Sequence, residues 1–148
     1  MNSLVNYSIM SDLLFHSISQ FFYSKKLYLF SKLFYRMNCL INSCDIPSSA
    51  NIHSTVSFPH RGLGVVIGHD TVIGANTKIG TCVTIGGRKG IRANPNIGEN
   101  CIIGSGAKIL GPVRIGNNCK IGANAVVITD VPDDCTAVGV PAKIIYNK

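Results

Sequence analysis

The chain has 148 residues, which leaves room for one domain and a short appendage. Its formal net charge is +7, yet it contains no zinc module, no stacked-aromatic RNA-binding motif and no block of lysine or arginine, so we expect no nucleic acid partner. An anionic small molecule or a membrane surface explains the charge equally well. The N-terminus lacks the pattern of a secretory signal, so we expect a cytoplasmic chain whose six cysteines remain reduced thiols.

A helical pattern runs from Ser11 to about Ile41. Leu14, Ile18 and Phe21 suit one short helix, and Ser24 is a candidate N-cap for a second. The second helix carries apolar residues at spacings of three and four: Leu27, Phe30, Phe34, Met37 and Ile41. Lys25, Lys26, Lys32 and Arg36 interrupt every apolar run before the ~18–20 residues that a membrane span requires. We expect these helices to cover the open strand edge of the domain that follows. The alternative is a basic amphipathic helix lying on the inner face of the membrane.

From residue 67 to residue 127 an aliphatic residue, usually isoleucine, returns every six positions. The third residue after it is of a type that tolerates the left-handed backbone region: Asp70, Asn76, Asn100, Gly106, Asn118 and Asn124. This period fits neither an amphipathic helix nor a hairpin meander, and it is typical of a parallel β-helix with three hexads per triangular coil. We therefore predict a mainly β fold, a left-handed parallel β-helix over residues 45–148, preceded by a helical segment over residues 1–44.

The period of six fails at two places within the repeat. Phe58 and Ile67 are nine residues apart, which predicts a bulge between Pro59 and Gly64, and twelve residues separate Ile85 from Ile97, which predicts a protruding loop over 86–96. Beyond Val127 the pattern decays, and residues 128–148 are a candidate C-terminal cap. A regular solenoid has few reasons to break its period, so the two interruptions are the first places to look for function.

His60 lies in the first interruption, fifteen residues after Asp45 and three short of one coil. This spacing predicts that the two side chains lie one layer apart. A carboxylate bonded to one imidazole nitrogen fixes the tautomer and raises the basicity of the other nitrogen. His60 is therefore a candidate general base for activating a hydroxyl that attacks an acyl group, and Asp45 is its candidate partner.

The stretch from Asp45 to Lys143 resembles the catalytic domain of serine acetyltransferases and, more closely, the short acetyltransferases of bacterial capsule, exopolysaccharide and O-antigen clusters. The motifs that carry the resemblance are Asp45-Ile46-Pro47, Phe58-Pro59-His60, Val83-Thr84-Ile85-Gly86-Gly87, Ile103 to Gly111, and Gly139-Val140-Pro141-Ala142-Lys143. The resemblance implies acetyl-CoA as donor, a homotrimer with sites between subunits, and direct acyl transfer with His60 as general base and Asp45 as its partner. It also implies that CoA meets the backbone of Gly87, Ser105 and Ala123, with Lys120 and Lys143 near its phosphates.

The sequence departs from the serine acetyltransferase pattern in the segments that hold the acceptor. Pro59-His60 stands where those enzymes have Asp-His, Ala93-Asn94-Pro95 stands where they have Arg-His-Pro, and the long N-terminal helical domain is reduced to some 44 residues. Arg92 and Asn94 are the remaining candidates for contacting the acceptor. These departures favour a sugar hydroxyl on a surface polysaccharide or its precursor, with serine as the alternative acceptor.

Two further functions are open on the same scaffold. A metal hydratase of the γ-carbonic anhydrase kind needs three imidazoles around one zinc, and the available His53, His60 and His69 lack that family's closely spaced histidine pair. We expect no metal. A non-catalytic trimeric module is the other possibility, and the Asp45–His60 spacing and Lys143 argue against it.

Overall fold

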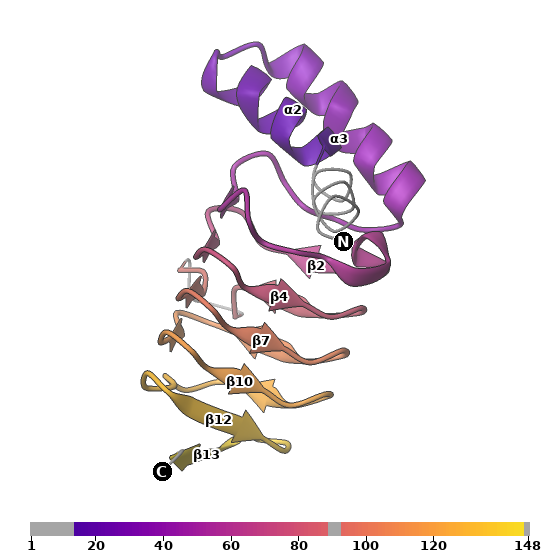
Figure 1. Cartoon of the computed structure of the whole chain (residues 1–148). Helices are drawn as coiled ribbons and strands as arrows, with labels where there is room; N and C mark the ends of the chain where they lie inside the picture. Colours follow the sequence, from indigo (N-terminus) through magenta and orange to yellow (C-terminus); the bar gives the residue numbers. More distant parts are fainter. Residues whose placement is uncertain (1–13, 89–92, 147–148) are drawn as a thin grey trace, which may run out of the picture.

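The computed structural model describes residues 14–88 and 93–146. Two helices, α2 (Leu14–Ser24) and α3 (Tyr28–Asn42), form a hairpin at one end of a column of short strands (Figure 1). Aromatic rings hold the hairpin together, since Phe22 stacks on both Phe30 and Phe34 with ring centroids 5.5 and 5.6 Å apart. In the described part of the chain, neither helix is long and apolar enough to cross a membrane.

The strands of the column pair in parallel with the strands one coil earlier and one coil later, which confirms the predicted left-handed parallel β-helix. The described strands form three sheets, one for each side of the triangular coil. The first contains β1 (Asn51–Ile52), β3 (Val72–Ile73), β6 (Asn96–Ile97) and β9 (Arg114–Ile115); the second contains β4 (Lys78–Ile79), β7 (Ile102–Ile103), β10 (Lys120–Ile121), β12 (Cys135–Val138) and β13 (Lys143–Tyr146); the third contains β2 (Val66–Ile67), β5 (Thr84–Gly86), β8 (Lys108–Leu110) and β11 (Val126–Val127). Strand β13 runs antiparallel to β12 and ends the column.

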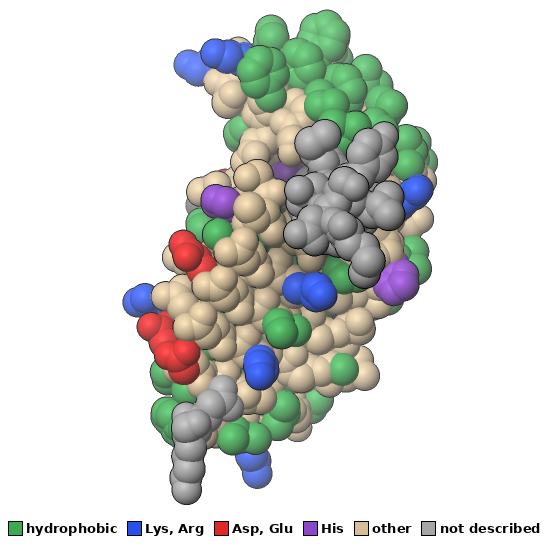
Figure 2. Space-filling model, viewed as in Figure 1, with side chains coloured by type: hydrophobic (Ala, Val, Ile, Leu, Met, Phe, Trp, Pro, Cys, Tyr) green, Lys and Arg blue, Asp and Glu red, His purple; other side chains and the backbone are tan. Residues whose placement is uncertain are grey.

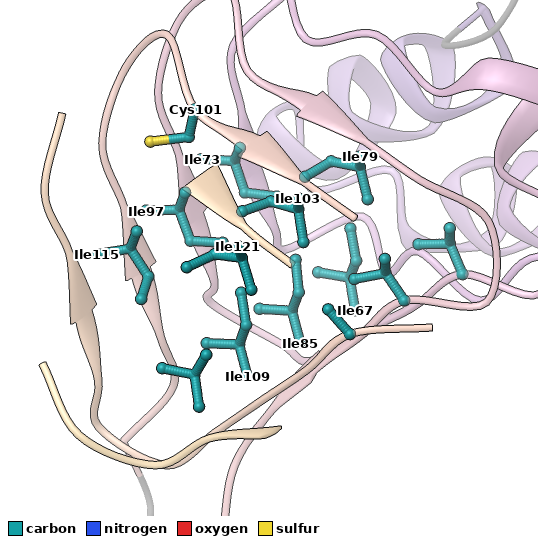
Figure 3. Packing of buried hydrophobic residues seen from close by; sticks show 14 of the residues in the cluster. Ile67, Ile73, Ile79, Ile85, Ile97, Cys101, Ile103, Ile109, Ile115 and Ile121 are labelled. Carbon is teal, nitrogen blue, oxygen red and sulfur yellow. The ribbon is translucent and has the colours of Figure 1, made fainter. Parts of the chain in front are cut away.

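The core is the column of aliphatic residues that the six-residue period predicted. In nearly every strand the first residue faces outward and the second is buried, because successive side chains of a strand point to opposite faces. The buried residues stack on one another across layers, as Figure 3 shows for Ile67, Ile85 and Ile109. The corner residues expected to be left-handed all have a positive φ, between 56° and 75°. Cys82 also has a φ of 57°, although cysteine gives no signal for that conformation.

The length of each coil shows where the chain departs from its repeat. A regular coil has 18 residues, so that Ile97 pairs with Ile115. The first coil is longer, since Asp45 pairs with Val66, and the extra residues form a short 3-10 segment, η1 (Pro59–Gly62). The coil that contains the second interruption has 24 residues, from Ile73 to its partner Ile97. Both predicted interruptions are thus insertions that leave the core register intact.

Two buried cysteines lie in adjacent layers, as their 18-residue spacing predicted. The Ile102 amide, next to Cys101, donates to the Cys119 carbonyl at 2.9 Å. The Cys101 thiol donates to the Gly116 carbonyl, and the Cys119 thiol to that of Pro132. Burial raises the pKa of the Cys101 thiol to about 11, so it stays protonated and unreactive at neutral pH.

The helical hairpin differs from the sequence prediction in two respects. Ser24 is not the N-cap of the second helix: it ends α2, its hydroxyl donates to the Phe21 carbonyl, and α3 begins after Leu27. The apolar stripe also does not pack against the β-helix. The hairpin is attached by polar contacts, in which the hydroxyls of Ser19 and Ser31 both reach that of Ser48.

His16 is buried within this polar inner face. Neither of its ring nitrogens has a hydrogen-bond partner among the described residues. Burial lowers the pKa of His16 to about 4 from an ordinary value of 6.5, with a smaller opposing effect from the backbone of Ile46. The imidazole is therefore neutral in the folded protein at every pH above about 4.

We expect the alternation within strand β7 to show in the stability of two neighbouring variants. Ile103→Ala removes a fully buried side chain and should lower the free energy of unfolding by about 2–5 kcal/mol. Ile102→Ala truncates a side chain that is 49% exposed and should change it by less than about 1 kcal/mol. Denaturant unfolding at one fixed protein concentration compares them. Equal losses would contradict the assigned inward and outward faces.

We expect His16 to make the fold acid-sensitive. Between pH 6.5 and about 4 the unfolded state binds a proton at His16 and the folded state does not, so stability falls as pH falls through this window. The loss amounts to roughly 3 kcal/mol at one pKa unit per 1.4 kcal/mol. Melting temperatures at pH 7.5 and pH ~4.5 should differ less in His16→Leu than in the parent chain. The same difference in both proteins would show that His16 does not titrate as described.

Candidate active site

His60 lies on the surface in a strained turn. It belongs to η1, and both His60 and Arg61 have left-handed backbones, with φ of 56° and 57°. Non-glycine residues in this region cost about 1–3 kcal/mol each and persist only where the surrounding structure fixes them. Here the flanks are fixed by the buried ring of Phe58 on one side and, on the other, by the Gly64 amide, which donates to the Ser43 carbonyl at 2.9 Å. Strain of this kind is concentrated at functional sites, and it presents the imidazole to solvent.

Asp45 is held firmly at the start of the β-helix. Its backbone bridges Val66, and its carboxylate Oδ1 accepts a hydrogen bond from the hydroxyl of Tyr35, on α3, at 2.6 Å. This bond raises the pKa of Tyr35 well above its ordinary value. The sequence gave no signal for the contact, because it depends on where the chain turns after α3.

In the described residues no hydrogen bond joins Asp45 to His60. The spacing argument assumed a coil of 18 residues, whereas the inserted turn lengthens this coil, so that His60 precedes Val66, the neighbour of Asp45, by six residues. The exposed imidazole and the exposed carboxylate belong to the same coil. Their pairing in catalysis remains a prediction.

Two of the predicted CoA-binding residues lie in one exposed row at a corner of the β-helix. Ser105 and Ala123 occupy the same corner in adjacent layers, and the Asn124 amide donates to the Ser105 carbonyl at 2.9 Å. The corner is kept narrow by glycine: a Cβ on Gly104 would stand 2.5 Å from the Ala123 nitrogen. An extended molecule can therefore approach the backbone along this row. Gly87, the third predicted residue, follows β5 and lies at a different corner.

Lys120 and Lys143 flank strand β12 in the sheet whose strands lead into the corner with Ser105 and Ala123. Lys120 pairs with Thr136 on one side of β12, and Lys143 pairs with Val138 on the other side. Both lysines are exposed. The structure thus brings the two predicted phosphate-binding lysines to one outer face of the column, as a bound anion would require.

The candidate acceptor residues are only partly described. The side-chain amide of Asn94 donates to the backbone carbonyl of His69, and this bond ties the end of the 86–96 loop to the layer before it. Arg92 lies outside the described residues. Asn94 therefore has a structural contact, and its predicted contact with the acceptor is untested.

The remaining histidines make local contacts. His53 bonds to Thr55 and His69 bonds to Ser49, each through Nδ1. Within residues 14–88 and 93–146, no three His, Cys, Asp or Glu side chains gather in a way that could hold a metal ion.

A cavity of about 440 Å³ lies between α3 and the first coils and is lined by Tyr23, Tyr28, Tyr35, Lys32, Ser48 and His69, among others. His60 is not part of its lining. The candidate base therefore opens to solvent at the surface of the single chain, where a neighbouring subunit could complete a site.

Comparison with known proteins identifies relatives along the whole length. Residues 94–129 match the family model "Bacterial transferase hexapeptide (six repeats)". The chain is 36% identical to a serine acetyltransferase of Bacillus pumilus over 97% of its own length and 67% of the relative's, and 34% identical to one of Synechococcus elongatus over 97% and 59%. A crystal structure of Neisseria gonorrhoeae serine acetyltransferase in complex with serine superimposes with a TM-score of 0.83 at 36% identity, covering 89% of this chain and 54% of that one. A serine acetyltransferase in complex with CoA gives a TM-score of 0.83 at 32% identity, covering 90% and 55%.

These relatives overturn the preference for a polysaccharide acceptor, which was wrong, and support the serine alternative. The preference rested on a few substituted positions around Pro59 and Asn94 and on a short helical segment. The identity to serine acetyltransferases is instead distributed over 97% of the chain, including that segment. The closer resemblance to capsule and O-antigen acetyltransferases is likewise not shown.

The chain spans between about half and two thirds of the length of the relatives and structures that it matches. Within that span it shares their fold, their hexapeptide repeat and about a third of their residues. On these grounds the chain belongs to the serine acetyltransferase family.

Proposed function

We propose that the protein transfers an acetyl group from acetyl-CoA to the hydroxyl of serine. The observation that carries the proposal is the 34–36% identity to serine acetyltransferases over 97% of the chain. Solved members of the family in complex with serine and with CoA support both substrates. The exposed, strained His60 supplies a base where the chemistry needs one.

In the proposed reaction the acceptor attacks the thioester directly. An imidazole nitrogen of His60 takes the proton of the serine hydroxyl as the oxygen forms a bond to the acetyl carbonyl carbon. The carbon–sulfur bond then breaks, the imidazolium returns the proton to the CoA sulfur, and O-acetylserine and CoA leave. Asp45 orients the imidazole and stabilises its charged form. Tyr35 occupies Oδ1 of Asp45, which leaves Oδ2 for His60.

CoA binding is proposed along the row that contains Ser105 and Ala123, with Gly87 contributed from another corner. Lys120 and Lys143 would neutralise the CoA phosphates from the neighbouring sheet. Arg92 and Asn94 would hold the serine, with Arg92 on its carboxylate. A homotrimer would unite these surfaces, because His60 and the corner row are exposed on the single chain rather than enclosed.

We expect His60→Ala to lose acetyl transfer while keeping its fold. With L-serine as acceptor, kcat should fall about a hundred- to ten-thousand-fold, the usual contribution of a general base. Release of the CoA thiol measures turnover, and circular dichroism checks the fold. His53→Ala is the matched control, since His53 is an exposed corner histidine whose bond to Thr55 is local, and it should retain activity.

Two results would refute these assignments. Turnover of serine by His60→Ala at the parent rate would exclude His60 as the base. Absence of serine turnover by the parent chain, with acetyl-CoA still consumed on another hydroxyl compound, would exclude serine as the acceptor.

We expect Lys120→Ala and Lys143→Ala to raise the KM for acetyl-CoA, roughly ten-fold for each lost charge-assisted contact. Acetyl-dephospho-CoA distinguishes a phosphate contact from a general effect, because it lacks the 3′-phosphate. A lysine that binds this phosphate makes the parent chain prefer acetyl-CoA, and its replacement removes the preference. Lys78→Ala, two layers away on the same outer face, should leave the KM unchanged. An identical ratio of KM values in the parent and both variants would show that neither lysine binds the 3′-phosphate.

A further inference from the structure

The helical hairpin has the reverse of the usual amphipathic arrangement. A helix on the surface of a soluble domain normally buries its apolar stripe and exposes its polar face. In α2 and α3 the buried side chains are all polar: His16, Ser19, Ser31, Asn38 and Asn42. They face the first coil, where Asn38 bonds to the thiol of Cys44 and Gln20 bonds to the Ala50 carbonyl. The inner face of the hairpin is therefore already occupied.

The apolar side chains of the hairpin consequently point away from the β-helix. On α3 they form a stripe at helical spacing, of which Leu29 and Leu40 are 79% and 83% exposed and Leu33 is also exposed. Phe21 and Leu14 of α2 and Phe30 and Ile41 of α3 are about half exposed. Figure 2 shows apolar side chains gathered over the helical end of the molecule. We call this surface, defined by Leu14, Phe21, Leu29, Phe30, Leu33 and Leu40, the outer face. An apolar surface of this kind marks an interaction site.

The charges around the outer face are all of one sign. Residues 14–44 contain Lys25, Lys26, Lys32 and Arg36 and no aspartate or glutamate. All four cations are exposed. Arg36 shares the stripe of Leu29, Leu33 and Leu40 by helical spacing, and Lys25 and Lys26 lie in the turn between the helices. Long basic side chains can lie along an apolar surface while their charged ends reach an anionic layer.

The sign of these charges selects the partner. Contact between the outer faces of two copies would bring two sets of four cations together with no carboxylate from either hairpin to neutralise them. An anionic lipid bilayer offers negative headgroups at the surface and apolar chains just below, which matches a basic, apolar face. Helices of 11 and 15 residues suit a position along that boundary.

We propose that the outer face docks the protein on an anionic membrane surface. The hairpin occupies one end of the column, and the β-helix extends away from it (Figure 1). In a trimer whose columns stand side by side, the three hairpins would lie at the same end and bind one membrane together. His60 and the row of Ser105 and Ala123 belong to the β-helix and would stay in water. This inference concerns location and is independent of the acceptor.

Vesicle sedimentation of the full-length chain tests the proposal. The parent chain should sediment with phosphatidylcholine vesicles that contain roughly one third phosphatidylglycerol, and far less with phosphatidylcholine alone. Raising the ionic strength should weaken the binding. Leu29→Glu/Leu40→Glu should reduce the bound fraction at least ten-fold. The matched control is Ile145→Glu/Tyr146→Glu, which adds the same charge at exposed apolar positions on β13, at the other end of the column, and should bind like the parent.

Absence of binding to the anionic vesicles, or equal binding by the parent and Leu29→Glu/Leu40→Glu, would overturn the proposal. So would a parent chain that forms a larger assembly in light scattering, is split by Leu29→Glu/Leu40→Glu and ignores vesicles, because the outer face would then be a protein interface. Serine turnover without vesicles should be the same in both proteins. A failure of membrane binding is thereby distinguished from a failure of the proposed catalytic function.

Discussion

The parallel pairing of each short strand with the strand one coil away is the interaction on which the rest of the structure depends. Strands of two or three residues have no stability of their own. Each is held by the hydrogen bonds and the buried side chain of the layers on either side, as Ile85 is held between Ile67 and Ile109. Neighbouring layers therefore stabilise one another, as in other repeat proteins. The outer positions and corners are left free to carry side chains for other purposes.

The candidate chemistry lies where the coils change length without losing this register. The coil that starts at Asp45 is longer than the regular one, and its extra residues form the turn that presents His60 with a left-handed backbone. The coil with the protruding loop is longer still, and Asn94 fastens its end to the backbone of His69. Because the core on both sides keeps its pairing, an insertion can carry a reactive side chain on a rigid base. The repeat positions the site, and the insertions supply it.

Helix α3 connects the two ends of this description. Its Tyr35 bonds to Asp45, the carboxylate proposed to orient His60, and its Leu29 and Leu40 belong to the face proposed to meet lipid. The hairpin is attached to the first coil mainly through side-chain hydrogen bonds, such as that of Ser31 with Ser48. Buried polar groups of this kind require partners in defined positions. The attachment therefore fixes the orientation of the hairpin and turns its apolar side outward.

The sequence by itself determined the β-helix, because its signals are local and repeated: an inward isoleucine in each hexad and a corner residue such as Asn118 that tolerates positive φ. It also located both insertions, since a broken period is visible along the chain. It misjudged the acceptor by weighing a few substituted loop positions above the likeness of the whole chain. Only the tertiary structure decided that Ser31 faces inward and Leu29 outward, and that Tyr35 meets Asp45. Helical periodicity shows which side chains share a face, but what that face touches depends on contacts between segments distant in the sequence, which form only when the chain is folded.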